Sequence, residues 1–367
     1  MDAPLATAPT LIAPLDAGPI DIVGDVHGEF TALLELLAAL GYDEAGEHPE
    51  GRRLVFVGDL GDRGPDSPGV YAWVGRLLDR GVASCVLGNH ELNLLRGARK
   101  DGNGWFFADD HDEPRSSYGD YRRASAADRA RILDLIARMP LALERDDLRV
   151  THAAWIPDAI AALRRRAGLG TLPIYQEHQH EIRRGLSRGG VDRRADAERT
   201  VFGHCLRDRE ARIPFLEAIA QQDLEYQMGN PVRVLTSGVE RLAARPYFLA
   251  GQWRMVERVP WWDAYDDDVP VIVGHYWRAP DERLRLAYAR HSNALFGANG
   301  PADWLGRRRR VFCVDFSIGG RYAERRRGMT GDFATRLAAV RWPERELVFE
   351  HGLEVPLGRT HAAGVPA

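Results

Sequence analysis

The segment Gly58-Asp59-Leu60-Gly61-Asp62-Arg63-Gly64 follows directly on a strand-like apolar run at 54–57. Two similar segments flank it along the chain: Gly24-Asp25-Val26-His27-Gly28 follows the run 20–23, and Gly88-Asn89-His90-Glu91 follows the run 82–87. Apolar residues with helical spacing occupy 30–40 and 70–78, between the three segments. Three consecutive strand–loop–helix units predict a largely parallel sheet, whose ligand sites gather at the carboxyl ends of its strands.

The polar residues of these segments have the chemistry of metal ligands. Asp, His and Asn suit Mn, Fe or Zn, and the segments contain no thiolate. The glycines let the backbone turn sharply and approach a ligand closely. His152 and His275 also follow predicted strands, at 148–150 and 269–274. Any one segment is explained equally well by a turn or a helix cap, but three in chain order indicate a catalytic metal site.

Composition limits the classes of protein that need to be considered. The chain has 367 residues, 45% of them hydrophobic and 28% charged, with a formal net charge of −4. These values are typical of a soluble globular protein and do not favour general nucleic-acid binding. No apolar stretch is long enough to span a membrane. The start lacks the basic region and long apolar run of a signal peptide, so we expect a cytoplasmic protein. The oligomeric state stays open.

The rest of the chain predicts one domain with an insertion. We expect a loose N-terminal arm at 1–19, the domain at 20–350 with an insertion at roughly 160–265, and a C-terminal tail at 351–367. The segment 97–121 resembles an insertion or lid, and 171–199 a surface loop rich in Arg, Gly and His. Helices are predicted at 128–139, 157–166 and 210–227. A hairpin is predicted at 141–150, and strands at 253–259, 269–274, 311–314, 336–340 and 347–349.

The three segments, followed by two separate histidines, resemble the calcineurin-like metallophosphoesterases. The Asp62-Arg63-Gly64 step is similar to the phosphoprotein phosphatase-like branch of that family. The stretches 314–321 and 336–347 resemble the end of the phosphatase domain of bacterial polynucleotide kinase–phosphatases. The resemblance implies an α/β fold: a four-layer α-β-β-α sandwich of two mixed sheets with helices outside. It also implies two divalent metal ions, with Mn expected first and an Fe/Zn pair or Ni as alternatives.

The resemblance also implies a role for each site residue. The implied metal ligands are Asp25, His27, Asp59, Asn89, His152 and His275, with Asp59 bridging the two ions. Arg63 is expected to bind the phosphate, His90 to act as general acid, and Asp62 to orient His90. A substrate-binding role is also expected for Asp315, although that residue is equally well explained as the end of a strand.

Two histidines compete for the last ligand position. Val201-Phe202-Gly203-His204 and Val271-Ile272-Val273-Gly274-His275 both have the pattern of a strand, a glycine and a histidine. We favour His275, because it lies closer to Asp315 along the chain, as the order of motifs in the family requires. His204 is then a histidine of a loop or of a helix start.

The function implied by the resemblance is phosphoester hydrolysis that depends on two metal ions. The substrate would be a phosphorylated protein, nucleotide or small molecule. The alternatives are a phosphodiesterase acting on cyclic nucleotides or dinucleoside polyphosphates, and a non-catalytic binding module on the same fold. The presence of His90, Asp62 and Arg63 together favours an enzyme, since a binding module needs no general acid. Arg pairs and Trp residues of the insertion would suit a nucleotide, but solvated helix faces and core packing explain them at least as well.

Overall fold

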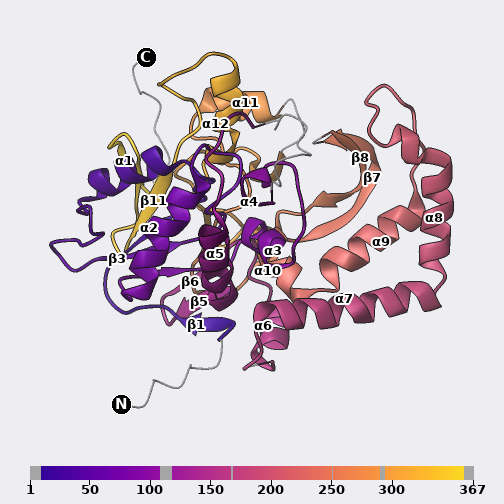
Figure 1. Ribbon diagram of the computed structural model, residues 1–367, viewed down its shortest axis with the longest axis horizontal. Helices are drawn as coiled ribbons and strands as arrows, with labels where there is room; N and C mark the ends of the chain where they lie inside the picture. The colour runs from indigo at the N-terminus through magenta and orange to yellow at the C-terminus, as the bar shows by residue number, and fades with distance from the viewer. Residues whose placement is uncertain (1–9, 108–117, 167, 250, 290–293, 359–367) are drawn as a thin grey trace.

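Two mixed β-sheets build the body of the molecule (Figure 1). The computed structural model describes residues 10–107, 118–166, 168–249, 251–289 and 294–358. The five-stranded sheet has the order β1 (Ile12–Pro14), β5 (Ala142–Arg145), β6 (Leu148–Thr151), β9 (Val271–Val273), β10 (Val311–Cys313). The six-stranded sheet has the order β13 (Glu354–Pro356), β12 (Glu346–Phe349), β11 (Ala338–Trp342), β2 (Ile20–Val23), β3 (Arg53–Phe56), β4 (Ala83–Cys85). Strands β2, β3 and β4 are parallel, as are β6, β9 and β10.

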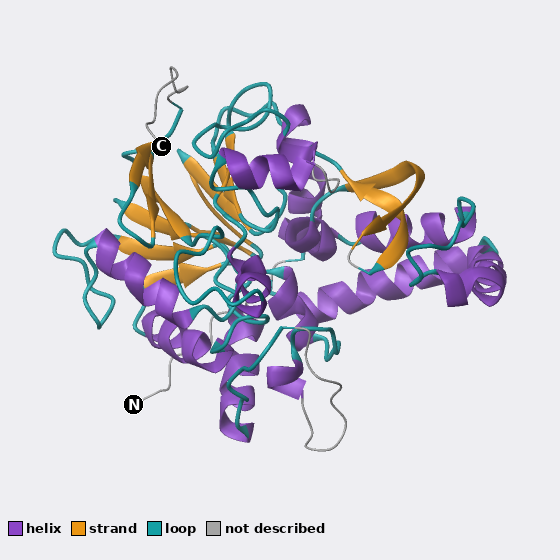
Figure 2. Ribbon diagram, turned by 90° about the horizontal axis from the view of Figure 1, so that it is seen from above, coloured by secondary structure: helices purple, strands orange, loops and turns teal. Residues whose placement is uncertain are grey.

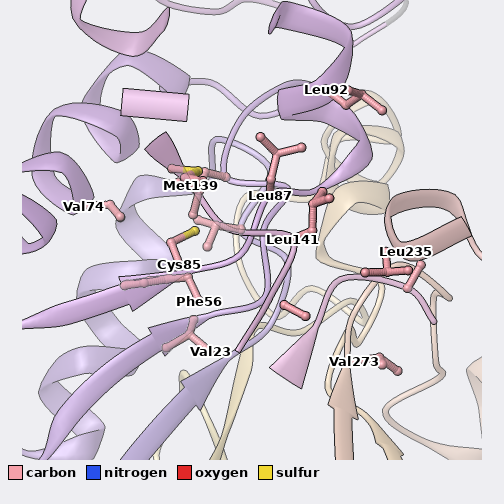
Figure 3. Packing of buried hydrophobic residues seen from close by; sticks show 14 of the residues in the cluster. Val23, Phe56, Val74, Cys85, Leu87, Leu92, Met139, Leu141, Leu235 and Val273 are labelled. Carbon is pink, nitrogen blue, oxygen red and sulfur yellow. The ribbon is translucent and has the colours of Figure 1, made fainter. Parts of the chain in front are cut away.

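Alternate residues of the strands form two separate apolar layers. Ile22 and Val55 of the six-stranded sheet share one buried cluster with Val150, Ile272 and Phe312 of the five-stranded sheet, so this cluster fills the space between the sheets. The neighbouring residues on β2, β3 and β4 point to the other face. There Val23, Phe56 and Cys85 lie side by side and pack with Val74 of helix α2 (Figure 3). The expected α/β class with two packed mixed sheets is confirmed.

Helices cover the outer face of the six-stranded sheet. They are α1 (Phe30–Leu40), α2 (Ser67–Asp79), α3 (Asn89–Leu95), α4 (Gly104–Phe107) and α5 (Ala126–Arg138). Helix α1 buries Leu33, Leu36, Leu37 and Leu40 at helical spacing and ends at Gly41, whose φ of 92° stops the helix. Further along the chain lie α6 (Pro157–Arg164), η2 (Trp261–Ala264), α11 (Glu282–Ala289), η3 (Ala294–Phe296), η4 (Ile318–Gly320) and α12 (Arg321–Arg326).

A helical lobe extends to one side of the sheets. We define the lobe as residues 171–258; it comprises α7 (Thr171–Arg188), α8 (Val191–Phe202), η1 (Gly203–Cys205), α9 (Glu217–Met228), α10 (Pro231–Ser237), β7 (Glu240–Leu249) and β8 (Gln252–Arg258). Figure 2 shows the β7–β8 hairpin and its helices standing apart from the two sheets. A small core of its own, including Ala195, Leu216, Ile219 and Met255, holds the outer part together.

The structure corrects the prediction for 171–199, which is helical rather than a surface loop. Helices α7 and α8 occupy almost all of it. The buried residues of these helices are few, among them Ile174, which joins the main apolar core, Leu186 and Ala195. A narrow apolar stripe among many Arg residues gave too weak a helical pattern to be recognised. The predicted helix at 210–227 begins later, at Glu217, after Pro214.

Short strands form within both predicted terminal segments. Within the expected arm, Ile12–Pro14 forms β1 and pairs with β5, and Leu11 and Leu15 are buried. Within the expected tail, Glu354–Pro356 forms β13 and pairs with β12. These strands were missed because each has only three residues and little alternation of polar and apolar side chains. Of the lid predicted at 97–121, residues 108–117 lie outside the described residues. Among the described helices, none has the length and apolar character that crossing a membrane requires.

Candidate active site

The six residues expected as metal ligands meet where strands of the two sheets end. Asp25 and His27 follow β2, Asp59 follows β3, and Asn89 opens helix α3 after β4. His152 follows β6 and His275 follows β9 in the other sheet. All except Asn89 are at least nine-tenths buried. The two sheets therefore bring residues that are up to 250 positions apart to one site.

One group of these side chains surrounds His27. Its Nε2 lies 3.8 Å from Asp25 Oδ2 and 3.8 Å from Asp59 Oδ2. Its Nδ1 donates a hydrogen bond to the Gly61 carbonyl at 3.1 Å, which leaves Nε2 facing the carboxylates. Two carboxylates and an imidazole thus converge within the reach of one cation.

A second group shares Asp59 with the first. His152 Nε2 lies 3.4 Å from Asp59 Oδ2 and 3.2 Å from Asn89 Oδ1. His275 Nδ1 lies 2.8 Å from the same Asn89 oxygen. Potential ligand atoms of Asp59, His152 and His275 all lie within 4.8 Å of one another, as do those of Asp59, His27 and His90. Asp59 therefore stands between two candidate cation positions.

The two competing histidines occupy different places. His275 lies in the second group, whereas His204 is exposed in the short turn η1 of the lobe. Gly274 is needed beside His275, since a Cβ at this position would lie 2.0 Å from Asp25 Oδ1. The backbone amide of His275 in turn donates to both oxygens of Asp25, at 3.2 Å each.

The loops at the site hold strained backbone conformations. His27, Asp59, Asp62, Arg63 and His275 all have positive φ values, between 47° and 72°. Residues other than glycine rarely adopt this region, and each such residue costs roughly 1–3 kcal/mol. Their concentration around one group of polar side chains is typical of a functional site.

Charge and burial at the site favour the binding of cations. Burial raises the pKa of Asp25, and the neighbouring carboxylates Asp315 and Asp59 raise it further. Burial also lowers the pKa of His27 and of His275, so both imidazoles are kept neutral, as a metal ligand must be. A cation would relieve the repulsion among the carboxylates.

The donor set fits divalent metal ions. It consists of carboxylate oxygens, an amide oxygen and imidazole nitrogens, which suit Mn, Fe, Zn or Ni. His275 Nε2 is buried and has no hydrogen-bond partner in the described part of the chain. An unpaired buried nitrogen costs free energy unless it binds something, which a metal ion would provide.

A hydrogen bond to a carboxylate fixes the orientation of the His90 ring beside the candidate metal ligands. Its Nδ1 donates to Asp62 Oδ2 at 2.5 Å, and its Nε2 faces the centre. The other oxygen of Asp62 accepts a hydrogen bond from Trp105 Nε1 at 2.6 Å. Trp105 therefore fixes the carboxylate that fixes His90. Nothing in the sequence pattern pointed to Trp105, because it lies 43 residues further along in a separate segment.

Arg63 projects its guanidinium over the same centre. Its Nη1 donates to His27 Nε2 at 3.1 Å and its Nη2 to His90 Nε2 at 3.2 Å. The ring of Trp277 lies under the guanidinium, 5.1 Å from its carbon. Two parallel N–H groups that face the cation positions can bind the oxygens of a phosphate in bidentate fashion.

Glu91 supports the site from beneath and had no role assigned from the sequence. Its carboxylate accepts hydrogen bonds from the amides of Asp59, Leu60 and Gly88 and from the Tyr71 hydroxyl. It is fully buried at the third position of helix α3, where a Glu is a recognised capping residue. The place of Glu91 at the third position of the helix is the sequence signal from which this supporting role could have been predicted. Glu91 holds the loops of Asp59 and Asn89 together.

Asp315 lies next to Asp25, but its oxygens are already engaged. They accept hydrogen bonds from the amides of Trp277 at 2.7 Å and Ser317 at 2.8 Å. The side chain is 1% exposed. These contacts brace the loops after β9 and β10. The direct substrate contact expected from the sequence stays a prediction.

Part of the chain is similar in sequence to a known family and to curated proteins. Residues 18–167 match the family model of the calcineurin-like phosphoesterases. The asymmetrical bis(5'-nucleosyl)-tetraphosphatase PrpE of Halalkalibacterium halodurans is 47% identical over 79 residues, which is 21% of this chain and 32% of that protein. PrpE of Geobacillus thermodenitrificans is 50% identical over 80 residues, which is 21% of this chain and 33% of that protein. The chain thus spans about a third of the length of these curated relatives. A solved cold-active protein-tyrosine phosphatase of a psychrophilic Shewanella is 13% identical, covers 97% of this chain and 87% of that chain, and has a TM-score of 0.43.

Proposed function

We propose that this chain, which carries a calcineurin-like phosphoesterase domain, is a metal-dependent phosphatase. The observation that carries the proposal is the meeting of two groups of metal-ligating side chains, joined at Asp59, with Arg63 and the Asp62–His90 pair. A module that only binds partners would have no need of a histidine oriented by a buried carboxylate beside an arginine.

The residues that would hold the metal ions divide at Asp59. Asp25, His27 and Asp59 would hold one ion, and Asp59, Asn89, His152 and His275 the other, with Mn expected first. When bound, the pair of ions would supply positive charge that attracts phosphoryl oxygens and lowers the pKa of a water molecule.

The remaining steps belong to residues of this chain. Arg63 would bind two phosphoryl oxygens through its paired N–H groups and offset negative charge that develops during the reaction. His90, with Nδ1 committed to Asp62, would deliver a proton from Nε2 to the departing oxygen. Asp62 would keep the ring in this orientation and stabilise the protonated imidazole before transfer.

A second candidate activity is the hydrolysis of dinucleoside polyphosphates. It is favoured by the similarity to the two tetraphosphatases over 79 and 80 residues. The same residues would serve, since a phosphoanhydride also presents phosphoryl oxygens and a departing oxygen. The closer likeness to polynucleotide kinase–phosphatases and a cytoplasmic location stay predictions.

A substrate panel with the purified chain tests the proposal. We expect turnover of p-nitrophenyl phosphate in the presence of Mn²⁺ and none after chelation. The panel should also contain a phosphopeptide, a 2′,3′-cyclic nucleotide and diadenosine tetraphosphate, tested with Mn²⁺, Zn²⁺, Fe²⁺ and Ni²⁺. Turnover of the cyclic nucleotide or the tetraphosphate alone would favour the phosphodiesterase alternative. A folded protein that turns over nothing with any of the four ions would point to a binding module.

A further inference from the structure

The ring of Trp277 lies against the guanidinium of Arg63, the side chain expected to bind the phosphate. The centre of the ring is 5.1 Å from the guanidinium carbon, within the range of an attractive contact between a cation and an aromatic face. Trp277 stands in the loop after β9, two residues beyond His275. Its side chain is partly exposed, so it is not simply a member of the apolar core. The reaction as proposed gives this side chain no task.

The backbone of Trp277 has a conformation that bulky residues rarely adopt. Its φ is 53°, in the left-handed region, which glycine and asparagine enter far more readily. Core packing does not explain a Trp at this position, because the ring is partly exposed. A bulky residue kept in such a conformation beside a group of polar side chains indicates that its side chain is needed there.

One buried carboxylate holds the loop of Trp277 in place. Asp315 Oδ2 accepts a hydrogen bond from the Trp277 amide at 2.7 Å, and Asp315 Oδ1 accepts one from the Ser317 amide at 2.8 Å. The Asp315 carbonyl accepts a bond from the Arg278 amide at 2.8 Å, and the Arg278 carbonyl accepts one from the Ser317 hydroxyl at 3.0 Å. The loops after β9 and β10 are therefore tied together at Asp315, and the backbone from which the Trp277 ring projects is fixed with them.

Two glycines let the loop after β10 pack closely around Arg63 and Trp277. A Cβ at Gly319 would lie 2.6 Å from Arg63 Nη1 and 2.4 Å from His27 Cδ2, so no side chain fits at this position. A Cβ at Gly320 would lie 3.2 Å from the Trp277 ring, which leaves little room for one. The backbone of these two glycines therefore lies directly against the guanidinium and the ring, and limits where either can move.

An aromatic ring can hold an arginine without occupying the groups that bind phosphate. Within the described residues no carboxylate forms an ion pair with Arg63, whereas Arg52 pairs with Asp21 and Arg321 with Glu350. A carboxylate partner would occupy N–H donors of Arg63 and offset the positive charge that attracts a phosphate. The indole instead contacts the flat side of the guanidinium, and the N–H groups at the edge stay free to face the centre.

We infer that Trp277 is a positioning residue for Arg63, whose ring holds the guanidinium in the plane from which two N–H groups reach the phosphoryl oxygens. The inference rests on the proposed function and adds to it a residue that acts through Arg63 without touching the substrate. Arg63 Nη1 and Nη2 already face His27 Nε2 and His90 Nε2, at 3.1 Å and 3.2 Å. Without the ring, the long arginine side chain would occupy further rotamers, and fewer molecules would have both N–H groups in place.

A double-mutant cycle of Trp277 and Arg63 is the direct test. With Mn²⁺ and phenyl phosphate, we expect Trp277→Leu to lower kcat/KM about tenfold, because the guanidinium is no longer held. In an Arg63→Met background the same substitution should lower kcat/KM by less than about twofold, because no guanidinium is left to position. Trp277→Phe keeps an aromatic face and should stay within about threefold of the wild type. Trp253→Leu, in strand β8 of the lobe, is the matched control and should keep the wild-type value.

A measurement on the Arg63 side chain itself separates the inference from the proposed function. In protein labelled with ¹⁵N, the Nε–H signal of Arg63 is the one that Arg63→Met removes. We expect its NMR order parameter to fall from the range of rigid groups, about 0.85, to below about 0.6 in Trp277→Leu. Trp253→Leu should keep the wild-type order parameter. If the wild type turned over no phosphoester, the proposed function would fail, yet this comparison would still decide whether Trp277 holds Arg63.

Three results would overturn the inference. One is an unchanged order parameter of Arg63 in Trp277→Leu. Another is an equal loss of kcat/KM from Trp277→Leu in the wild-type and Arg63→Met backgrounds, which would mean that the ring acts on the substrate or on the fold. The third is a lower Mn content of Trp277→Leu, measured by mass spectrometry, since the ring would then support the loop of His275. If thermal unfolding shows Trp277→Leu to be unstable, Trp277→Met, whose longer side chain fills more of the space, takes its place in all these measurements.

Discussion

The Nδ1–H of His90 donates to Asp62 Oδ2 at 2.5 Å, while Arg63, the residue next to Asp62, places Nη2 at 3.2 Å from the opposite nitrogen of the same ring. One tight loop thus grips the His90 imidazole on both sides. Nδ1 is the nitrogen fixed by the carboxylate, so Nε2 is the one left to exchange a proton with a substrate. Positive φ values at both Asp62 and Arg63 give the loop the shape that this requires.

Replacing His90 tests the proton-transfer role. We expect His90→Asn to lower kcat about 10²-fold or more on a phosphoester with a poor leaving group, such as phenyl phosphate. The loss should be smaller with p-nitrophenyl phosphate, because nitrophenolate departs without help from an acid. Metal content, measured by mass spectrometry of the purified protein, should stay at the wild-type value. Equal losses on both substrates would argue against a general acid and for a ligand role.

Replacing Asp62 tests the orienting contact. Asp62→Asn keeps the size of the side chain and leaves an oxygen that can accept the hydrogen bond from Trp105. It removes the negative charge that faces His90. We expect a loss of about tenfold or more in kcat with little change in KM, since the ring would be less firmly held in its productive orientation. Steady-state kinetics on phenyl phosphate provides the measurement. Rates equal to the wild type would show that His90 needs no orienting partner.

Replacing Glu91 tests the support beneath the site. Glu91→Ala leaves three backbone amides and the Tyr71 hydroxyl without their buried acceptor. Each unsatisfied donor costs about 1–3 kcal/mol, so we expect the free energy of unfolding to fall by several kcal/mol in urea denaturation. Tyr71→Phe is the matched control, because it removes one of the four hydrogen bonds and should cost about 1 kcal/mol. Similar stability of the two variants would contradict this role.

Removing metal tests the two candidate cation positions. The carboxylates crowded around Asp25 repel one another, so the chelated protein should be less stable. Mn²⁺ at 100 times its dissociation constant should raise the free energy of unfolding by about 2.7 kcal/mol. Differential scanning calorimetry with and without chelator measures the difference. His275→Ala should weaken the stabilisation by Mn²⁺, whereas His204→Ala should leave it unchanged, since His204 is exposed on the lobe. Identical melting curves with and without Mn²⁺ would contradict the proposal that the site binds metal ions.

The local chemistry of the site could be read from the sequence. Each of the segments at Asp25, Asp59 and Asn89 follows a strand directly, so the order of strand, glycine and ligand predicted both a sheet and the edge at which polar side chains would gather. The two-sheet architecture, implied by the resemblance, is confirmed. A strand, the glycine turn after it and the ligand that follows lie within a few residues of one another. The local sequence therefore decides where each ligand stands relative to its strand.

The helices of the lobe and the partners of Asp62 and Glu91 could not be read in this way. Helices α7 and α8 bury too few side chains to show a clear apolar stripe. Trp105 reaches Asp62, and Tyr71 reaches Glu91, from segments whose position depends on how α2 and α4 pack. Contacts of this kind are set by packing between elements, which no local pattern records.

The amino-acid sequence by itself determined which side chains would lie at strand ends, because a strand and the turn after it are specified by neighbouring residues. Only the tertiary structure decided that His275 rather than His204 stands beside Asn89, and that Arg258 of the lobe stands beside Tyr276. The physical reason is that β6, β9 and β10 are parallel within one sheet, and β2 and β3 are parallel within the other. Packing of the two sheets then brings the end of β9 close to the ends of β2, β3 and β4. His204 follows helix α8, which packs within the lobe. Its sequence pattern resembles that of His275, but the lobe holds it away from the candidate metal centre.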